Sequence, residues 1–151
     1  MTASDDATQL VTAFEGFRSC PYRDPTGVWT IGYGSTRDAA GNPVCATTPC
    51  IPQDVARSLV ERDLGAAFAE VARDVHTPLT ASQTAALADF VYNLGAGNFR
   101  ASTLLRKLNA GDYAGAAAEF DKWDHAGGRE LAGLLKRREA ETQLFNAKAG
   151  G

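Results

Sequence analysis

The stretch "EGFRSCPYRDPTGVWTIGYGST", residues 15–36, joins a glutamate at the end of one element to a tight turn and a glycine-rich strand. Within it, "DPTG" has the residues that a type I turn favours, with Asp24 at its first position and proline next. In "VWTIGYG", side chains alternate, so Thr30 shares a face with Gly32 and Gly34. The stretch therefore predicts a turn and a strand whose glycine face leaves room for a ligand or another backbone.

The residues around this stretch read mainly as helices, because apolar residues recur at helical spacing. The expected helices are residues 4–15, 53–75, 81–94, 103–110, 113–124 and 129–147. The fold class is therefore α+β and mostly helical. We expect one domain over residues 1–151, with a small β-containing lobe (about 15–52) joined by the long helix to a larger helical lobe (about 76–147). A cleft between two such lobes is a usual place for a ligand.

Length and composition describe an ordinary globular chain: 151 residues, 44% hydrophobic and 22% charged. A net charge of −3 argues against a dedicated nucleic-acid binder, which usually carries a basic footprint. No apolar run approaches the roughly 20 residues that span a bilayer, so no stable membrane association is expected. The opening "MTASDDATQ" has neither the basic nor the apolar region of a secretory signal, which predicts a chain that starts in the cytoplasm.

The chain has three cysteines, and two of them bracket the loop segment "CATTPC". Cys45 and Cys50 would either close a small disulfide ring in an oxidising compartment or stay as two reduced thiols. In both cases Cys20 is left unpaired. The two histidines are isolated and no pair of ligands recurs at a useful spacing, so we expect neither a metal nor a cofactor.

Glu15 falls in the last turn of the first expected helix, where the helix dipole is negative. That field, together with burial beside Phe14 or Phe17, favours the protonated carboxyl that a general acid needs. The plain alternative is a surface glutamate paired with Arg18, three residues on. Position alone therefore leaves both readings open.

Taken singly, Asp24 is an ordinary turn residue and Thr30 an ordinary strand residue. Together with Glu15, however, they can converge on one small volume. Two carboxylates that flank a substrate bond are the arrangement for glycoside hydrolysis, and a hydroxyl beside them can hold the attacking water. This combination predicts a glycosidase site.

The spacing Glu15, eight residues, Asp24, five residues, Thr30, inside "EGF…YRDPTGVWTIGYG", resembles the Glu–Asp–Thr triad of phage-type lysozymes, the endolysins of glycoside hydrolase family 24. Two later stretches resemble the same family. They are "FVYNLGAGNFRASTLLRKLNAGDYAGAA" at 90–118 and "KWDHAGGRELAGLLKRREAETQLF" at 122–145. The resemblance covers nearly the whole chain and implies a lysozyme-like fold.

The resemblance also implies an activity: cleavage of the β-1,4 bond between N-acetylmuramic acid and N-acetylglucosamine in peptidoglycan, with inversion. Glu15 would be the general acid. Asp24 would stabilise the oxocarbenium-like transition state and help to activate water, and Thr30 would position that water. The carboxyl groups of an inverting enzyme stand about 6.5–9.5 Å apart to admit the water.

Three further residues are expected to contact the sugar: Tyr92 and Asn93 in one helix, and Gly32 in the strand. The alternative for the first two is helix packing near Gly95. Ser35 stands where many relatives carry a histidine, a departure that bears on stability or pH response before activity.

The expected partner is a peptidoglycan glycan strand, and the expected protein is a monomer. It would wait in the host cytoplasm and depend on a holin-made membrane lesion to reach the periplasm and cell wall. A lytic transglycosylase and a non-catalytic glycan- or partner-binding module are the competing readings. Phe120 and Trp123 are expected in the core. "LLKRREAE" reads as a solvated helix face, on which Arg137 or Arg138 is free to meet wall carboxylates.

Overall fold

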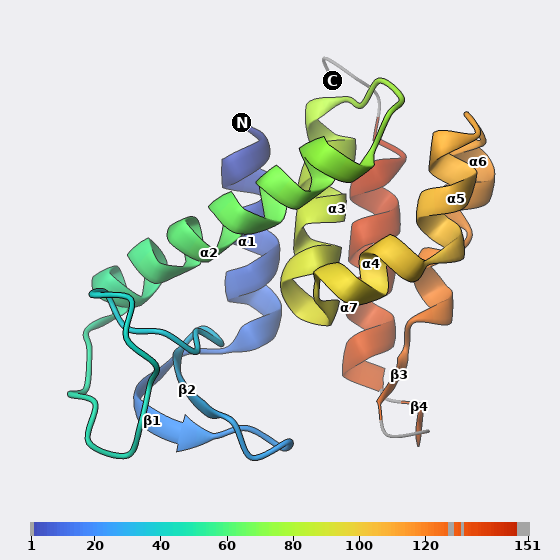
Figure 1. Cartoon of the computed structure of the whole chain (residues 1–151). Coiled ribbons are helices and arrows are strands. Elements are labelled where there is room, and N and C mark those ends of the chain that lie inside the picture. The colour runs from blue at the N-terminus through green and yellow to red at the C-terminus, as the bar shows by residue number, and fades with distance from the viewer. Residues whose placement is uncertain (1, 127–128, 131, 148–151) are drawn as a thin grey trace.

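The computed structural model describes residues 2–126, 129–130 and 132–147. Its elements are α1 (Ala3–Glu15), β1 (Arg18–Arg23), β2 (Trp29–Gly32), α2 (Gln53–Asp74), α3 (Ala81–Leu94), α4 (Ala96–Ala101), α5 (Thr103–Asn109), α6 (Tyr113–Ala117), the 3₁₀ helix η1 (Phe120–Lys122), β3 (His125–Ala126), β4 (Arg129–Glu130) and α7 (Ala132–Phe145). Figure 1 shows the sheet β1–β2 at one end of the long helix α2 and most of the other helices gathered at its other end. The α+β, mostly helical fold class is confirmed.

The first helix packs in the main core, and its end leads into the β1–β2 hairpin. Ala7 and Val11 of α1 are fully buried in the main core. The helix ends at Glu15, and Gly16 with φ +68° turns the chain toward β1. Glu15 therefore lies where the helical core meets the β1–β2 hairpin.

The predicted turn closes an antiparallel hairpin. Gly27 donates its backbone N–H to the carbonyl of Asp24 at 2.9 Å, as a four-residue turn requires. The register places Tyr22 of β1 opposite Thr30 of β2. Because directly opposed residues of a sheet project to the same face, Tyr22 and Thr30 are neighbours on one side of the hairpin.

A small cluster of Ile31, Val44 and Leu59 docks the hairpin onto α2. The larger core lies among the helices and is centred on α3, where the ring of Phe90 makes edge contacts with Phe120 and Trp123. Phe120 is fully buried and Trp123 packs against this cluster, so their expected core placement is confirmed.

The glycine face of β2 is not the open surface that the alternation predicts. Thr30 is only 3% exposed. A Cβ on Gly32 would lie 3.1 Å from the Cβ of Ala56 in α2, so helix packing takes the space that this glycine leaves. The space at Gly34 is taken by the side chain of Glu15. At Gly32 the alternative of a closely approaching backbone is therefore confirmed, because α2 leaves no room for a ligand there.

The later helices differ from their expected bounds. The single helix expected over 113–124 is divided into α6 and η1, and the short helix α4 was not expected. The last helix begins at Ala132 instead of 129, because residues 125–130 contain the small antiparallel pair β3–β4. Among the described residues, no helix is both long and apolar enough to cross a bilayer.

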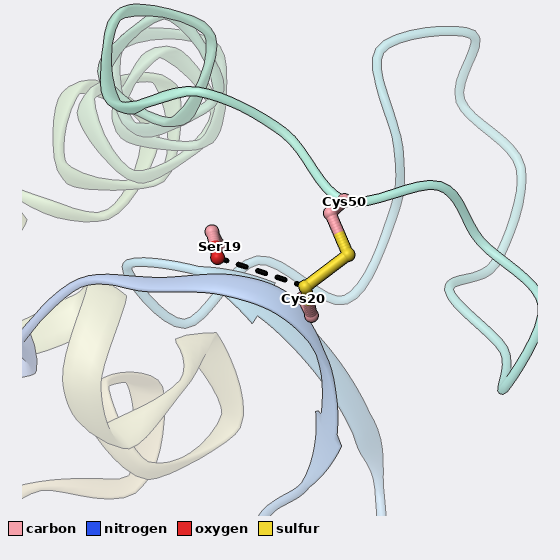
Figure 2. The surroundings of a disulfide bond; sticks show 3 residues. All are labelled: Ser19, Cys20 and Cys50. Carbon is pink, nitrogen blue, oxygen red and sulfur yellow. Dashed lines mark hydrogen bonds between the residues drawn. A yellow bond between two sulfur atoms is a disulfide. The ribbon is translucent and has the colours of Figure 1, made fainter.

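The expected pairing of the cysteines is wrong. Cys20 of β1 forms a disulfide with Cys50, their Cα atoms 4.2 Å apart, and Cys45 is exposed and free (Figure 2). The reason is the path of the backbone. Ile51 donates its N–H to the carbonyl of Ser19 at 2.8 Å, which holds the segment before α2 against β1.

Candidate active site

Glu15 is held on both sides of its carboxyl group. Its Oε1 accepts a 2.6 Å hydrogen bond from Nη1 of Arg137, which comes from α7. On the other side, a Cβ at position 34 would lie 2.8 Å from Oε2, and Gly34 has φ +93°, which L side chains rarely adopt. Arg18 does not pair with Glu15 but stacks 4.1 Å above the ring centroid of Tyr22.

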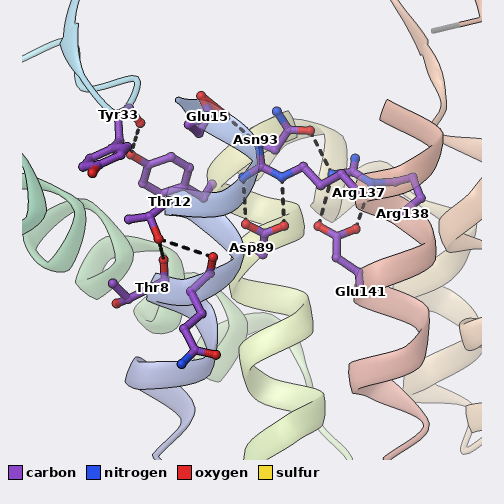
Figure 3. A network of polar contacts seen from close by, with 11 residues as sticks. Thr8, Thr12, Glu15, Tyr33, Asp89, Asn93, Arg137, Arg138 and Glu141 are labelled. Carbon is purple, nitrogen blue, oxygen red and sulfur yellow. Dashed lines mark hydrogen bonds and ion pairs between the residues drawn. The ribbon is translucent and has the colours of Figure 1, made fainter. Parts of the chain in front are cut away.

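Arg137 is itself anchored by Asp89 of α3. Nε and Nη2 of Arg137 donate to the two carboxylate oxygens of Asp89 at 2.9 and 2.7 Å. Beside them, Arg138 pairs with Glu141, with Nε and Oε1 2.8 Å apart (Figure 3). We call Glu15, Asp89, Arg137, Arg138 and Glu141 the buried charge network.

The prediction of a solvated face for "LLKRREAE" is wrong at its central positions. Arg137 is 3% exposed, and Arg138 and Glu141 are not exposed at all. Neither arginine is free to meet a wall carboxylate. Instead both lie between α7 and α3, and Arg137 reaches the carboxyl at the end of α1.

The charge states follow from burial and contacts. Burial opposes the charge of Asp89, but hydrogen bonds with Glu141 and Arg137 outweigh it and lower the pKa of Asp89. Burial, together with a hydrogen bond and the charge of Asp89, raises the pKa of Glu141 well above its usual value. Burial likewise opposes the charge of Arg137, yet Asp89 and then Glu15 raise its pKa. The contacts of Asp89 with Arg137 therefore favour its anion, whereas the surroundings of Glu141 favour its protonated form.

Asp24 is built into the hairpin turn through one oxygen. Its Oδ1 accepts from the Thr26 hydroxyl at 2.7 Å and from the N–H groups of Thr26 and Val28, each at 2.9 Å. The hydroxyl of Thr26 and the amide of Val28 are the main reasons why the pKa of Asp24 is lowered. The hydroxyl of Thr30 donates to the carbonyl of Val28 at 2.9 Å. The backbone of Val28 therefore binds both side chains: its N–H donates to Asp24, and its carbonyl accepts from Thr30.

Tyr22 is the residue that relates the three predicted site residues to one another. Burial raises the pKa of Tyr22 most, followed by the charge of Glu15; Arg18 acts in the opposite direction, and Asp24 adds a smaller upward effect. Both carboxylates are therefore close enough to act on one phenol, and Thr30 lies directly across the sheet from it. Tyr22 is thus within electrostatic reach of Glu15 and Asp24 and is paired with Thr30 across the hairpin.

The expected sugar contacts are engaged within the protein. The hydroxyl of Tyr92 donates to the carbonyl of Tyr33 at 2.8 Å, and burial, then the charges of Asp63 and Glu15, raise its pKa. Asn93 accepts a 2.8 Å hydrogen bond from Nη2 of Arg138 on its Oδ1 (Figure 3). This bond fixes the orientation of the Asn93 amide.

A cavity of about 540 Å³ lies between the hairpin lobe, α2 and the end of α3. Its lining includes Gly34, which follows β2, Asp63 and Glu70 of α2, and Tyr92 of α3. Because Gly34 lies against the carboxyl of Glu15, this cavity begins beside that acid. The residues lining it do not include Glu15, Asp24, Thr30 or Asn93.

Sequence reasoning missed Arg137, Asp89, Tyr22 and the contact between Gly34 and Glu15. For the arginines a signal was present, because Leu134, Arg138, Glu141 and Phe145 recur at helical spacing on one face. For the contact between Arg137 and Glu15 there was none, because the two residues are 122 positions apart.

Comparison with known proteins identifies the family. The profile described as phage lysozyme matches residues 12–141. This chain belongs to the phage lysozyme family. It is 39% identical to an endolysin of Acyrthosiphon pisum secondary endosymbiont phage 1, covering 97% of this chain and 99% of that protein. It is 38% identical to a SAR-endolysin of Escherichia phage Mu, with 93% and 78% covered. A solved structure of P22 lysozyme superposes with a TM-score of 0.83 at 33% identity, covering 97% of this chain and 99% of that one.

These relatives confirm the expected family, fold and class of reaction. A phage lysozyme is a glycosidase, and its substrate is peptidoglycan. The chain is therefore a peptidoglycan hydrolase of phage-mediated cell-wall lysis.

Proposed function

We propose that the chain is a muramidase that cuts the β-1,4 bond between N-acetylmuramic acid and N-acetylglucosamine, with inversion at the anomeric carbon. Glu15 is the general acid, Asp24 the carboxylate that activates water and stabilises the oxocarbenium-like charge, and Thr30 the hydroxyl that orients the water. The observation that carries this proposal is geometric: the backbone of Val28 binds the side chains of both Asp24 and Thr30, and the carboxyl of Glu15 lies against Gly34, two residues after β2.

The two carboxyl groups have the different environments that acid and base roles need. Asp24 accepts three hydrogen bonds on Oδ1, which stabilise its anion and leave Oδ2 to take a proton from water. Thr30 donates its only hydroxyl proton to Val28, so its lone pairs are left to accept from that water. Asp24 and Thr30 can therefore both accept a hydrogen bond from the attacking water, and the carboxylate of Asp24 can take its proton.

Glu15 is placed to deliver a proton at the cleft. Its side chain is 21% exposed and lies against Gly34, which is one of the residues that line the cavity. Arg137 holds Oε1, so Oε2 is the oxygen that faces a glycosidic bond. In an inverting enzyme, water enters from the opposite side of the sugar, which is the side of Asp24.

The glycan strand would lie between the two lobes, residues about 15–52 and 76–147. In this proposal the ring of Tyr92 forms a wall of the cavity and the oriented amide of Asn93 donates to the sugar. Gly32 contributes by letting β2 pack closely on Ala56, which positions the strand.

Release and assembly complete the proposal. The enzyme accumulates in the host cytoplasm as a monomer and reaches the periplasm and cell wall through a lesion made by a holin. This part of the proposal rests on the similarity to an endolysin alone.

The test is clearing of permeabilised Gram-negative cells by the wild type and by Glu15→Gln. Loss of a general acid lowers the rate by about 10²- to 10⁴-fold, so the variant is expected to clear at least about a hundredfold more slowly. Equal clearing by both would remove Glu15 from its role, and no clearing by the wild type would favour a glycan- or partner-binding module.

The chemical form of the products separates hydrolysis from transglycosylation. Digested peptidoglycan is expected to show muramic acid with a free reducing end, initially as the α-anomer. Anhydro-muramic ends would identify a lytic transglycosylase and would contradict the water-activating roles of Asp24 and Thr30.

A further inference from the structure

We propose that Asp89 is a positioning residue of the reaction: it orients Arg137 against Glu15 and cancels enough of its charge for Glu15 to hold the catalytic proton. This inference rests on the proposed role of Glu15 as general acid. Asp89 touches no substrate, because it is completely buried in α3.

The orientation follows from the planar guanidinium group. Two of its N–H donors bind the two oxygens of Asp89 at 2.7 and 2.9 Å, in the bidentate geometry that fixes the plane of the group. The third contact, from Nη1 to Oε1 of Glu15, is then aimed by the first two. With 3% exposure, Arg137 has no room for another position.

The charge balance follows from the buried charge network. An isolated arginine 2.6 Å from Glu15 would hold that residue as an anion, which is the wrong state for an acid catalyst. Asp89 is an anion paired to the same guanidinium. The pair presents Glu15 with a strong donor but little net positive charge, so the glutamate can bind a proton and still be held in place.

The other charged and titratable groups near Glu15 do not supply this balance. Arg138 is paired with Glu141 at 2.8 Å, and Oδ1 of Asp24 is occupied by the hydrogen bonds of its own turn. Tyr22 and Tyr92 feel the charge of Glu15 but are neutral, and Arg18 stacks on Tyr22. Asp89 is thus the anion that directly contacts the guanidinium bound to Glu15.

The experiment measures kcat/KM against pH on soluble peptidoglycan fragments for the wild type, Asp89→Asn, Arg137→Gln and the double variant. The alkaline limb reports loss of the proton from the general acid. Asp89→Asn leaves Arg137 uncompensated, so this limb is expected about one pH unit lower than in the wild type. Arg137→Gln leaves the negative charge of Asp89 uncompensated, so the alkaline limb is expected at a higher pH than in the wild type. The double variant removes both charges, so its limb returns close to the wild-type position while kcat remains low because the positioning is lost.

A matched control is Glu119→Gln. Glu119 is also buried and paired with two cations, Lys107 and Lys122, but it has no contact with the buried charge network. Its variant is expected to leave the alkaline limb unchanged. Thermal unfolding of every variant confirms that the folded enzyme is being compared.

The proposal is overturned if folded Asp89→Asn has the wild-type alkaline limb, or if the double variant is displaced as far as Asp89→Asn. Should Asp89→Asn not fold, Arg137→Gln and the double variant provide the same comparison, and coincident limbs in those two overturn the proposal. Glu15→Gln distinguishes failure of the proposed function from failure of this inference. If Glu15→Gln stays active, the proposed function fails. If Glu15→Gln is inactive but the alkaline limb of Asp89→Asn is not displaced, only the role of Asp89 is refuted.

Discussion

The hairpin that carries Asp24 and the helix interface that carries Arg137 hold their polar groups in opposite ways. All the hydrogen-bond partners of Asp24 lie within four residues of it, and most are exposed backbone or hydroxyl groups of one turn. Arg137 binds residues 48 and 122 positions away in sequence, and it is almost fully buried. The hairpin is a local structure, whereas the interface exists only in the complete fold.

This difference teaches that the two halves of the site depend on the fold to different degrees. A change in the turn alters how water is held but leaves the core intact. A change in the buried charge network alters both the proton donor and the packing of α1, α3 and α7. We therefore expect hairpin variants to lose activity before stability, and interface variants to lose both.

The largest expected effect on stability is that of Arg137→Met. Removing one member of a buried ion pair leaves an uncompensated charge, here on Asp89, and such changes destabilise by about 3–5 kcal/mol. Urea unfolding at neutral pH measures the loss. Asp24→Asn is the matched comparison and is expected to unfold close to the wild type while losing activity. Equal unfolding midpoints for the two variants would show that the contrast between hairpin and interface is wrong.

The same contrast explains what the sequence could predict. The turn at Asp24 and the helix over 81–94 were both predicted, because both depend on neighbours within a few residues. That helix begins with a capping box of Thr80 and Gln83 and ends at Gly95. The site residues of the hairpin were recognised because their spacing is itself local.

The rest depends on which segments meet in space. The pairing of Cys20 with Cys50 is set by the path of a loop, and the contact of Glu15 with Arg137 by three packed helices. In α7 the charges at 137, 138 and 141 indicated a solvated face, because charged residues are seldom buried without partners and the partners are far away in sequence. Burial of a charge is a property of the pair, which a single segment does not show.

Removing the disulfide tests whether the hairpin is stable by its local contacts alone, as this contrast implies. The disulfide closes a separation of 30 residues and ties β1 to the entrance of α2 (Figure 2). Cys20→Ser is expected to destabilise the protein by roughly 3–4 kcal/mol, the usual value for a loop of this length. Chemical unfolding with and without reductant measures it. Cys45→Ser removes the free thiol instead and is expected to change nothing; a loss of stability only in that variant would contradict the pairing.

Gly34→Ala tests a point where the segment after β2 touches the helix interface. The left-handed backbone adds roughly 1–2 kcal/mol of strain for alanine, and the new Cβ displaces the carboxyl of Glu15. A misplaced catalytic group slows the reaction by about a hundredfold, so activity is expected to fall far more than stability. Gly111→Ala is the control, because Gly111 has φ +81° but no atom within 4 Å of its added Cβ. Equal activity losses in both variants would mean that strain, and not the contact with Glu15, is responsible.

The smallest expected effect comes from Thr26→Val, which acts within the turn alone. The hydroxyl of Thr26 donates to Oδ1 of Asp24 at 2.7 Å and is the largest cause of the lowered pKa of Asp24. Valine removes this donor but keeps the 2.9 Å bond from the backbone N–H. The pKa of Asp24 therefore rises toward its ordinary value of about 3.9.

For a carboxyl whose pKa is lowered by folding, the charged form and its contribution to stability are lost as the pH falls through the folded pKa. Because Asp24 acts as an anion in the proposed reaction, the acid limb of kcat/KM is expected to move upward by a few tenths of a pH unit in Thr26→Val. Activity above pH 6 and the unfolding temperature are expected to stay near the wild-type values, since no buried group changes. Thr47→Val, in an exposed loop away from Asp24, controls for the loss of a surface hydroxyl. An acid limb that moves downward, or that moves equally in both variants, would show that the turn does not set the charge of Asp24 and that the hairpin, like the interface, needs partners from elsewhere in the fold.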